Sequence, residues 1–540
     1  MQRTLAHLTA IAVFASPLLR LERVEGSPAV YDSGPVEISA TEKPGKGDAA
    51  SPVERLDELV SLRLREEFDV PALRICTDAV FLRRAHLCAI GTLPTEEEAR
   101  LFLDDPSSGK REALVDSLLE REEFTDYWTM KWEDLLRVKS EFPINLWPNA
   151  VEAYHRRIRT SVRKNQPYHE FVRNLLTANG SNFRVGEVNF YRAMQDRSPH
   201  GIAATVAQTL MGERVEHWPK KKHDALAAFF SQVAFKPTGE WKEEIVYFDP
   251  AADVAGRGKN LVFPDGTPAK IQPGRDPREV FADWLLRPDN PAFTANICNR
   301  AWAWIMGRGI VHEPDDFRPD NPPSNPELLD FLQAEFVKSR CDIKALFGII
   351  LKSQTFQASP FPVEDTPEAA ANFAHFAPRR MEAEVLIDAI DQIAGTRDTY
   401  SSPIPEPFTF TPEDARAITL ADGSITSSFL ELFGRPPRDT GRLSERSLEI
   451  TAAQRLHMLN STHIHEKIRA CPLVRDVADG EATGPEHVEK IYLTVLSRRP
   501  TDEETAKIDA YAETSSLQGK EFAADLVWAL LNQPEFYLVH

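Results

Sequence analysis

The chain has 540 residues, which at roughly 150 residues per domain is enough for two or more hydrophobic cores. Its 82 acidic and 63 basic residues give a formal net charge of -19, and this acidic balance argues against a nucleic-acid-binding protein. The hydrophobic content of 42% is that of an ordinary folded protein, and 40 prolines against 25 glycines favour stiff connections over flexible ones.

Residues 1–52 are expected to form a signal peptide or a disordered N-terminal tail. Arg3 precedes an apolar run at residues 5–19 that contains no Asp, Glu, Lys or Arg, which is the layout of a signal peptide. The run is shorter than the roughly 20 residues of a membrane-spanning helix, and no span is expected after it. Residues 27–52 are rich in Pro, Gly, Ser and charge, which favours disorder. We therefore expect a periplasmic or secreted protein, with a cytoplasmic protein as the alternative.

The five cysteines are odd in number and scattered: Cys76, Cys88, Cys298, Cys341 and Cys471. No Cys-x-x-Cys pair occurs in the sequence. The spacing therefore predicts neither a disulfide scaffold nor a cysteine zinc site, and it allows at most one remote pair beside free thiols.

Apolar periodicity, caps and helix breakers predict a mainly α-helical first domain at residues 53–272. Its helices are expected at residues 53–68, 78–87 with Asp78 as the N-cap, 97–103, 110–120, 124–138, 150–163 and 168–177. Residues 203–232 are expected to form two helices that the lysines at 220–222 interrupt. Residues 245–248 and 261–263 are strand candidates for a small antiparallel β piece near 243–272, which marks the boundary between two helical domains.

The second helical domain is expected at residues 273–540, and its clearest local signals lie at residues 291–336. Apolar residues at helical spacing, with Trp304 among them, predict a helix that is buried on most sides and ends at Gly307. Ser324 and Glu327 have the spacing of a capping box for the next helix. Further helices are expected at residues 451–460, 486–496, 503–513 and 521–531, and a loop at residues 399–412.

Two segments at opposite ends of the chain share one plan. Residues 81–124 and 491–536 each contain a helix, a Pro-Thr step with acidic residues, a second helix, a lysine-containing turn, and a helix that ends in Leu-Leu-x-x-x-Glu-Phe. We predict that these are related helical units that pack against each other and close the structure.

Several longer motifs carry a family resemblance. Residues 81–95, 131–138 and 188–193 resemble domain of unknown function 1549. Residues 282–285, 299–302, 307–309, 314–317 and 323–329 resemble its usual downstream companion, domain of unknown function 1553, and residues 429–438, 457–460, 496–500 and 528–536 continue that match. The resemblance covers nearly the whole chain from about residue 53.

The resemblance implies a secreted or envelope protein of planctomycete type, without an established activity, in a family where many members carry a haem-binding Cys-x-x-Cys-His motif. This chain has Glu216-His217-Trp218-Pro219 followed by Lys220-Lys221-Lys222-His223-Asp224 in the corresponding stretch. Covalent c-type haem needs two thiols, so no haem is expected here. Cys88, Asn325 and residues 441–446 also depart from the family pattern, which disfavours inherited redox or metal chemistry. We therefore expect no cofactor.

The candidate binding residues form two groups: Asn299, Arg300, Arg308, Asp315 and Asp316 around one loop, and His457 and Asn460 further along the chain. Carboxylates beside arginines are suited to acid–base chemistry or anion binding, and equally to ion pairs that fix a loop. The simpler interpretation is that Arg300 and Arg308 orient the loop at 315–320. His457, with His463 and His465 nearby, lacks the i, i+4 spacing of a helical zinc site, so no metal site is predicted.

Two functions remain open on the sequence. The first is a non-enzymatic binding or assembly protein of the cell envelope, whose partner is an unknown protein or an envelope polymer. The second is a hydrolase or other enzyme with its site from Arg300 to Asp320. An unpaired arginine and two carboxylates in a concave pocket would favour the enzyme, and the same residues fully paired under packed helices would favour the binding protein.

Overall fold

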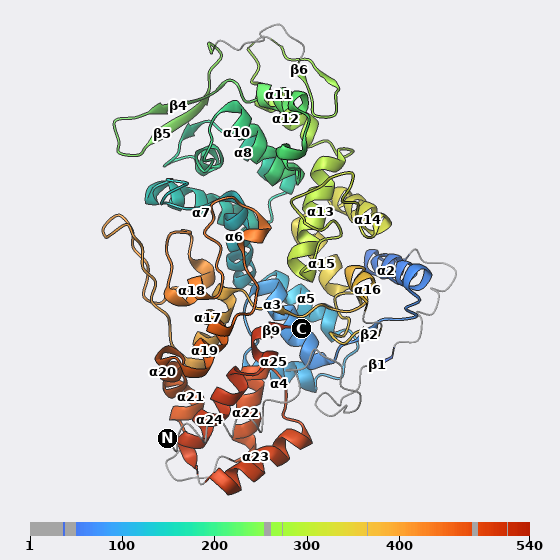
Figure 1. The fold of residues 1–540 in the computed structure, drawn as a ribbon, viewed down its shortest axis with the longest axis vertical. Coiled ribbons are helices and arrows are strands. Elements are labelled where there is room, and N and C mark those ends of the chain that lie inside the picture. The colour runs from blue at the N-terminus through green and yellow to red at the C-terminus, as the bar shows by residue number, and fades with distance from the viewer. Residues whose placement is uncertain are drawn as a thin grey trace.

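The computed structural model describes residues 36–37, 50–252, 261–272, 274–363, 366–477, 484–515 and 517–540. The predicted signal peptide lies outside these residues, and so does nearly all of the predicted tail. The described chain is mainly α-helical with small antiparallel sheets, which confirms the predicted fold class. Its helices fill an elongated molecule, with the three-stranded sheet near one end and the last helices at the other (Figure 1).

The described first half of the chain forms helices α2 to α11 and three shorter helical turns. They are α2 (Pro52–Phe68), α3 (Asp78–Ile90), α4 (Glu96–Asp104), α5 (Lys110–Leu119), α6 (Glu122–Leu136), α7 (Pro148–Arg163), α8 (Tyr168–Thr177), α9 (Asn189–Arg192), α10 (Pro199–Val206) and α11 (Lys220–Ala228), with the 3-10 turns η1 (Gly186–Val188) and η3 (Val215–His217) and the π-helical turn η2 (Ala207–Met211).

The second half of the chain packs back against the first. Its helices are α12 (Pro277–Leu285), α13 (Pro291–Met306), α14 (Pro326–Lys338), α15 (Ile343–Lys352), α16 (Pro367–Ala371), α17 (Ala383–Ala394), α18 (Ser428–Leu432), α19 (Ala452–Asn460), α20 (Thr462–Ala470), α21 (Pro472–Arg475), α22 (Pro485–Leu496), α23 (Asp502–Ser515), α24 (Gly519–Leu531) and α25 (Pro534–Tyr537), with the 3-10 turns η4 (Ala417–Thr419) and η5 (Leu443–Glu445).

The strands are short and antiparallel. They pair as β1 (Val36–Glu37) with β2 (Arg74–Ile75), β6 (Leu261–Val262) with β7 (Pro268–Ala269), β8 (Arg379–Arg380) with β9 (Leu538–Val539), and β3 (Gly180–Ser181), β5 (Glu244–Phe248) and β4 (Val233–Pro237) in the order β3-β5-β4. Both predicted strands are present as β5 and β6. The edge strand β4 was not predicted, because its short run follows directly on the apolar residues that end α11.

Three details of the helix starts differ from the sequence prediction. Thr77, not Asp78, caps α3, and its hydroxyl accepts from the amide of Val80. Asn325, not Ser324, caps α14 through the amide of Leu328. The three lysines from Lys220 form the first turn of α11 instead of interrupting a helix, because the preceding proline suits the start of a helix.

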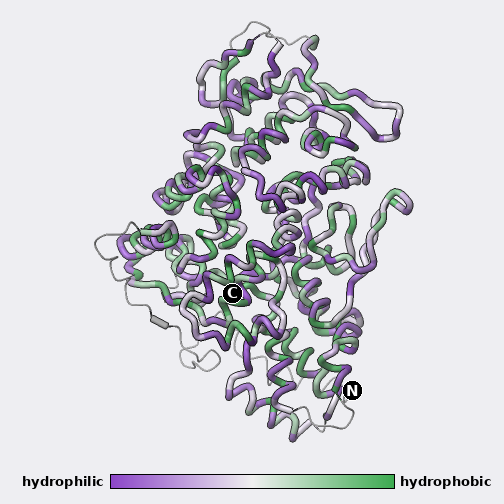
Figure 2. Tube along the Cα trace, turned by 180° about the vertical axis from the view of Figure 1, so that it is seen from behind, coloured by the Kyte–Doolittle hydropathy of each residue, from purple (hydrophilic) through white to green (hydrophobic). Residues whose placement is uncertain are grey.

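The core joins the two halves through aromatic side chains. Trp128 and Trp132 of α6 are both buried, and their rings lie 5.6 and 5.3 Å from that of Trp304 on α13. All residues of α13 from Phe293 to Met306 are buried, as the sequence predicted for this helix. Hydrophobic and hydrophilic residues alternate along most of the helices (Figure 2). No helix among the described residues combines the length and the apolar character needed to cross a membrane.

The predicted pairing of the two related helical units is confirmed. Helix α4 packs against α22, and α3 against β9. The guanidinium of Arg83 on α3 donates to the carbonyl oxygens of Val495 and Phe536, at 2.9 and 2.5 Å. The ion pairs Arg100–Glu489 and Arg499–Asp104, both 2.9 Å, cross the same interface nearer the surface.

The two units also share their caps. α3 ends at Gly91 with φ 58°, and α22 ends at Ser497 with φ 60°, both in the left-handed region. Four residues later, Thr95 forms a capping box with Glu98, and in the second unit Thr501 does so with Glu504. The left-handed turn and the capping box therefore recur at the same spacing in both units.

An arginine bridges the corresponding carboxylates in each unit, but from a different position. Arg121, which follows α5, pairs with Glu98 and Glu123, each at 2.6 Å. In the second unit, Arg498, which follows α22, pairs with Glu504 at 2.7 Å and with Glu535 at 2.6 Å. Both units therefore contain this bridge, although its arginine comes from different positions in the two units.

Candidate functional site

Arg300 and Asp315 form a closed ion pair at the centre of the predicted site. Arg300 lies on α13, Asp315 lies in the loop before α14, and the distance from Nη2 to Oδ1 is 2.6 Å. Each side chain is only 2% exposed. Arg300 also donates to the carbonyl of Thr209 on η2 at 2.8 Å, and the second oxygen of Asp315 accepts from the amide of Leu443 at 2.8 Å. The pair therefore ties four segments of the chain together.

Asn299 is engaged in the same loop. Its side-chain amide donates to the carbonyl of Val311 at 3.0 Å, and its oxygen accepts from the amide of Val311 at 2.8 Å. The intervening Gly309 is required by this packing, because a Cβ there would lie 2.3 Å from the Val311 carbonyl oxygen. Asn299 thus fixes the chain that leaves α13 and has no hydrogen-bonding capacity turned to solvent.

Asp316 has looser surroundings. Its side chain is 8% exposed and lies 3.2 Å from Nε of Arg318, 3.8 Å from Nε2 of His217 and 3.9 Å from Nη1 of Arg214. Oδ1 of Asp316 is buried and has no hydrogen-bond partner among the described residues. The side chain of His217 is 45% exposed, so a partly exposed imidazole lies between this carboxylate and solvent.

Arg308 lies apart from these carboxylates. It is half-buried directly after α13, burial lowers the pKa of its guanidinium, and its Nε has no hydrogen-bond partner among the described residues. Burial, together with the charge of Arg308, lowers the pKa of His312. Arg300 pairs with the loop as the simpler interpretation predicts, whereas no ion pair joins Arg308 to it among the described residues, and Arg214 and Arg318 are the further cations beside Asp316.

His457 and Asn460 lie on α19, in a different part of the molecule from α13 (Figure 1). Nε2 of His457 lies 3.4 Å from Nδ1 of His463, whose Nε2 lies 2.7 Å from the carboxylate of Asp398. Lys467 pairs with the same carboxylate at 2.9 Å. Burial and the neighbouring His463 lower the pKa of His457. Asn460 is exposed at the end of the helix. The structure does not bring this group together with the loop at 315–320.

A buried charge network that the sequence analysis did not single out lies beside the Arg300–Asp315 pair. Arg446 pairs with Glu384 of α17 at 2.5 Å and with Asp134 of α6 at 2.6 Å. Arg438 pairs with Asp134 at 2.8 Å and with Glu133 at 3.3 Å. Burial alone would raise the pKa of Glu384. The adjacent guanidinium of Arg446 and other neighbouring groups outweigh this effect and lower the pKa of Glu384 to about 2.

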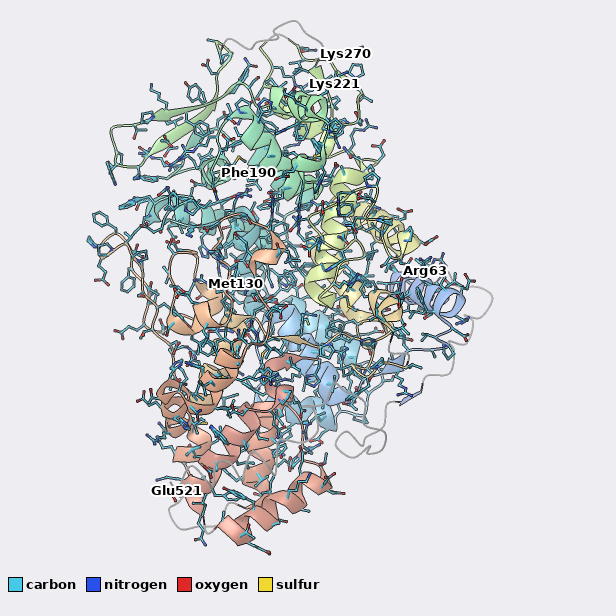
Figure 3. The ribbon with its side chains drawn as sticks, viewed as in Figure 1. Arg63, Met130, Phe190, Lys221, Lys270 and Glu521 are labelled. Carbon is cyan, nitrogen blue, oxygen red and sulfur yellow. The ribbon has the colours of Figure 1, made fainter. Side chains whose placement is uncertain are left out.

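This network lies near the middle of the molecule, where the label of Met130 marks α6 (Figure 3). Glu133, Asp134 and Arg438 come from runs that also carry the family resemblance, at residues 131–138 and 429–438, whereas Glu384 and Arg446 lie outside these runs. The signal available in the sequence was therefore the density of charge within otherwise apolar motifs. The partners could not be matched from sequence, because Arg438 and Asp134 are 304 positions apart.

A small cavity separates the ion pair from the network. Its volume is about 20 Å³, and Lys131, Asp134, Arg300, Asp315 and Arg446 contribute to its lining. A cavity of roughly 10–15 Å³ is enough for one water molecule. This space is therefore the size of a single water and does not admit a substrate.

Comparison with known proteins identifies the two parts of the chain. Residues 55–234 match the model PSCyt2, described as a protein of unknown function (DUF1549), and residues 277–512 match PSD1, described as a protein of unknown function (DUF1553). No curated protein and no solved structure matches the chain. The chain therefore belongs to the proteins that carry a DUF1549 region followed by a DUF1553 region, as its motifs predicted.

Proposed function

We propose that this protein is a non-enzymatic binding or assembly module that acts in the cell envelope or outside the cell. The observation that carries the proposal is the closed Arg300–Asp315 pair, in which both side chains are buried and are hydrogen-bonded to backbone groups of other segments. Charges in such positions are already paired within the fold and are not available to a substrate.

The surroundings of the pair support the same conclusion. The adjoining cavity has the volume of one water molecule, and the network of Arg438 and Arg446 fills the remaining space with paired charges. A catalytic pocket usually has a volume of several hundred Å³. The central charges are therefore the joint between the two matched regions, and binding takes place on the outer surface.

The proposed location rests on the apolar run at residues 5–19, which has the layout of a signal peptide. The proposal includes no haem-based electron transfer. Residues 212–230, which correspond to the haem-binding stretch of the family, contain no cysteine, and covalent c-type haem needs two thiols.

An enzyme is the second candidate, and one observation favours it. Asp316 has a buried oxygen without a hydrogen-bond partner among the described residues, and the half-exposed His217 lies 3.8 Å away. A carboxylate that orients a solvent-accessible histidine is a common acid–base arrangement. On this alternative, His217 is the base of a hydrolase and Asp316 positions it.

The two functions are separated by assaying the full chain for turnover of ester and polysaccharide substrates and, in parallel, for capture of envelope components. A binding protein captures a component and turns over none of the substrates. Asp316→Asn tests any turnover that is found, with Asp320→Asn as the matched control, because Asp320 lies in the same loop with its side chain 75% exposed. Turnover that is lost in Asp316→Asn and kept in Asp320→Asn would establish the enzyme and remove the binding proposal.

A further inference from the structure

Exposed aromatic side chains gather along one edge of the molecule. Phe142, Trp241 and Phe410 are 77%, 69% and 74% exposed, and Phe408 is more than half exposed. Exposed large aromatic residues that lie together mark interaction sites, since soluble proteins rarely leave such surface open to water. We call Phe142, Trp147, Trp241, Phe408 and Phe410 the aromatic ledge.

Three chain segments form the aromatic ledge. The β4–β5 hairpin, the start of α7 and the loop that follows α17 project from the same side of the molecule, at the left in Figures 1 and 3. A groove of about 510 Å³ runs between the tip of the hairpin, with Trp241, and Asn145. Two residues further along, the ring of Trp147 lies 5.6 Å from that of Phe408. Residues 145–147 therefore link the groove to the aromatic pair along the chain.

Phe142 belongs to the same turn as Asn145, because the amide of Asn145 donates to the carbonyl of Glu141 at 2.9 Å. The backbone of the turn is strained at two places. Asn145 has φ 59°, and Trp147 has φ 71° and ψ 148°, a conformation that is nearly restricted to glycine. Such conformations are energetically unfavourable and cluster at ligand sites. The protein keeps a large aromatic residue here at an energetic cost, and its ring packs at the surface.

The charged residues of the groove balance one another. Its lining contains three basic and three acidic side chains: Arg192, Arg197, Lys242, Glu240, Glu243 and Glu244. Glu244 pairs with Arg192 at 2.6 Å and with Arg197 at 3.1 Å, and Glu243 accepts from the hydroxyls of Ser181 and Thr238. On a chain with a net charge of -19, the groove is thus a locally neutral surface.

The charge balance of the groove indicates which class of ligand it suits. An anionic or cationic polymer would gain nothing from a groove without net charge, and a protein partner needs a continuous apolar centre. An uncharged polymer of sugars fits both features, because its C–H faces stack on aromatic rings while its hydroxyls bond to carboxylates, guanidinium groups and amides. We propose that the aromatic ledge and its groove bind an uncharged polysaccharide. This inference rests on the binding function proposed above and names its ligand class.

The test is binding of the full chain to soluble uncharged polysaccharides, such as dextran, galactomannan and hydroxyethyl cellulose, by affinity electrophoresis and calorimetry. We expect binding to at least one of them, and a loss of affinity of about tenfold or more in Trp241→Ala and in Phe410→Ala. Both rings are exposed, so these variants keep the fold. Leu101→Ala is the matched control, because Leu101 is an exposed apolar residue on α4, 65% accessible, and its replacement should leave the affinity unchanged.

Several results would overturn the inference. They are the absence of binding to all uncharged polysaccharides, equal affinity in the ledge variants and the wild type, tighter binding to polygalacturonate than to the uncharged polymers, or self-association of the chain that Trp241→Ala abolishes. If the protein instead captures an envelope protein through another surface, the binding function stands and the polysaccharide inference fails. Turnover that depends on Asp316 would remove the binding function itself.

Discussion

Replacing Asp315 with alanine leaves the guanidinium of Arg300 buried without its counter-charge. Both side chains are 2% exposed, and removal of one partner from such a pair costs about 3–5 kcal/mol. The amide of Leu443 loses its acceptor as well, since it donates to the second oxygen of Asp315 at 2.8 Å. We therefore expect local opening around Leu443 to become easier by at least about 3 kcal/mol, which is roughly a hundredfold in the opening equilibrium.

Hydrogen exchange at the Leu443 amide measures this opening directly. It is preferable to a global unfolding curve, because a chain of 540 residues with two matched regions is not expected to unfold in one step. Asp320→Ala is the control: its side chain is 75% exposed, so its exchange should match the wild type. A double variant, Arg300→Met with Asp315→Ala, should recover part of the protection because no unpaired charge remains. Unchanged exchange in Asp315→Ala would refute the structural role of the pair.

Two further predictions concern the first helical unit. Burial lowers the pKa of His86 to about 4 from its ordinary 6.5, so the unfolded chain binds more protons between these values, and stability falls by about 3 kcal/mol as the pH drops from 6.5 to 4. Hydrogen exchange at the amides of α3 should show a smaller fall in local stability in His86→Leu, and an equal fall in both proteins would contradict the reasoning. Gly91→Ala should lower the thermal midpoint, because the residue has φ 58° and a Cβ would lie 2.5 Å from the ring of Tyr127. A midpoint equal to that of the wild type would contradict the steric argument for Gly91.

Local signals predicted much of the fold. The helix at Tyr168–Thr177 was predicted to the residue, because Pro167 and a strongly amphipathic run define it without help from the rest of the chain. The capping box of Thr95 and Glu98 likewise depends only on residues that are close in sequence. The π-helical turn at Ala207–Met211 carries no such signal, since it follows α10 directly and continues its apolar sequence.

The candidate site was predicted only where its parts are close in sequence. The loop with Asp315 and Asp316 was found from its carboxylates and arginines. The partners that decide its character were not, because Thr209, Leu443 and His217 reach it from other regions of the chain. A charged motif shows that a partner is needed, and only the fold shows which residue supplies it.

The packing of the two related units has a consequence for how the chain is made. Arg83 and Arg84 are almost completely buried, and carbonyl oxygens that they require belong to Val495, Phe536 and His540, which are 412, 453 and 456 positions later. An arginine buried without these acceptors is strongly unfavourable. Helix α3 therefore cannot reach its final packing until α22 and α25 have been synthesised, and until then it stays open to chaperones or a translocation channel.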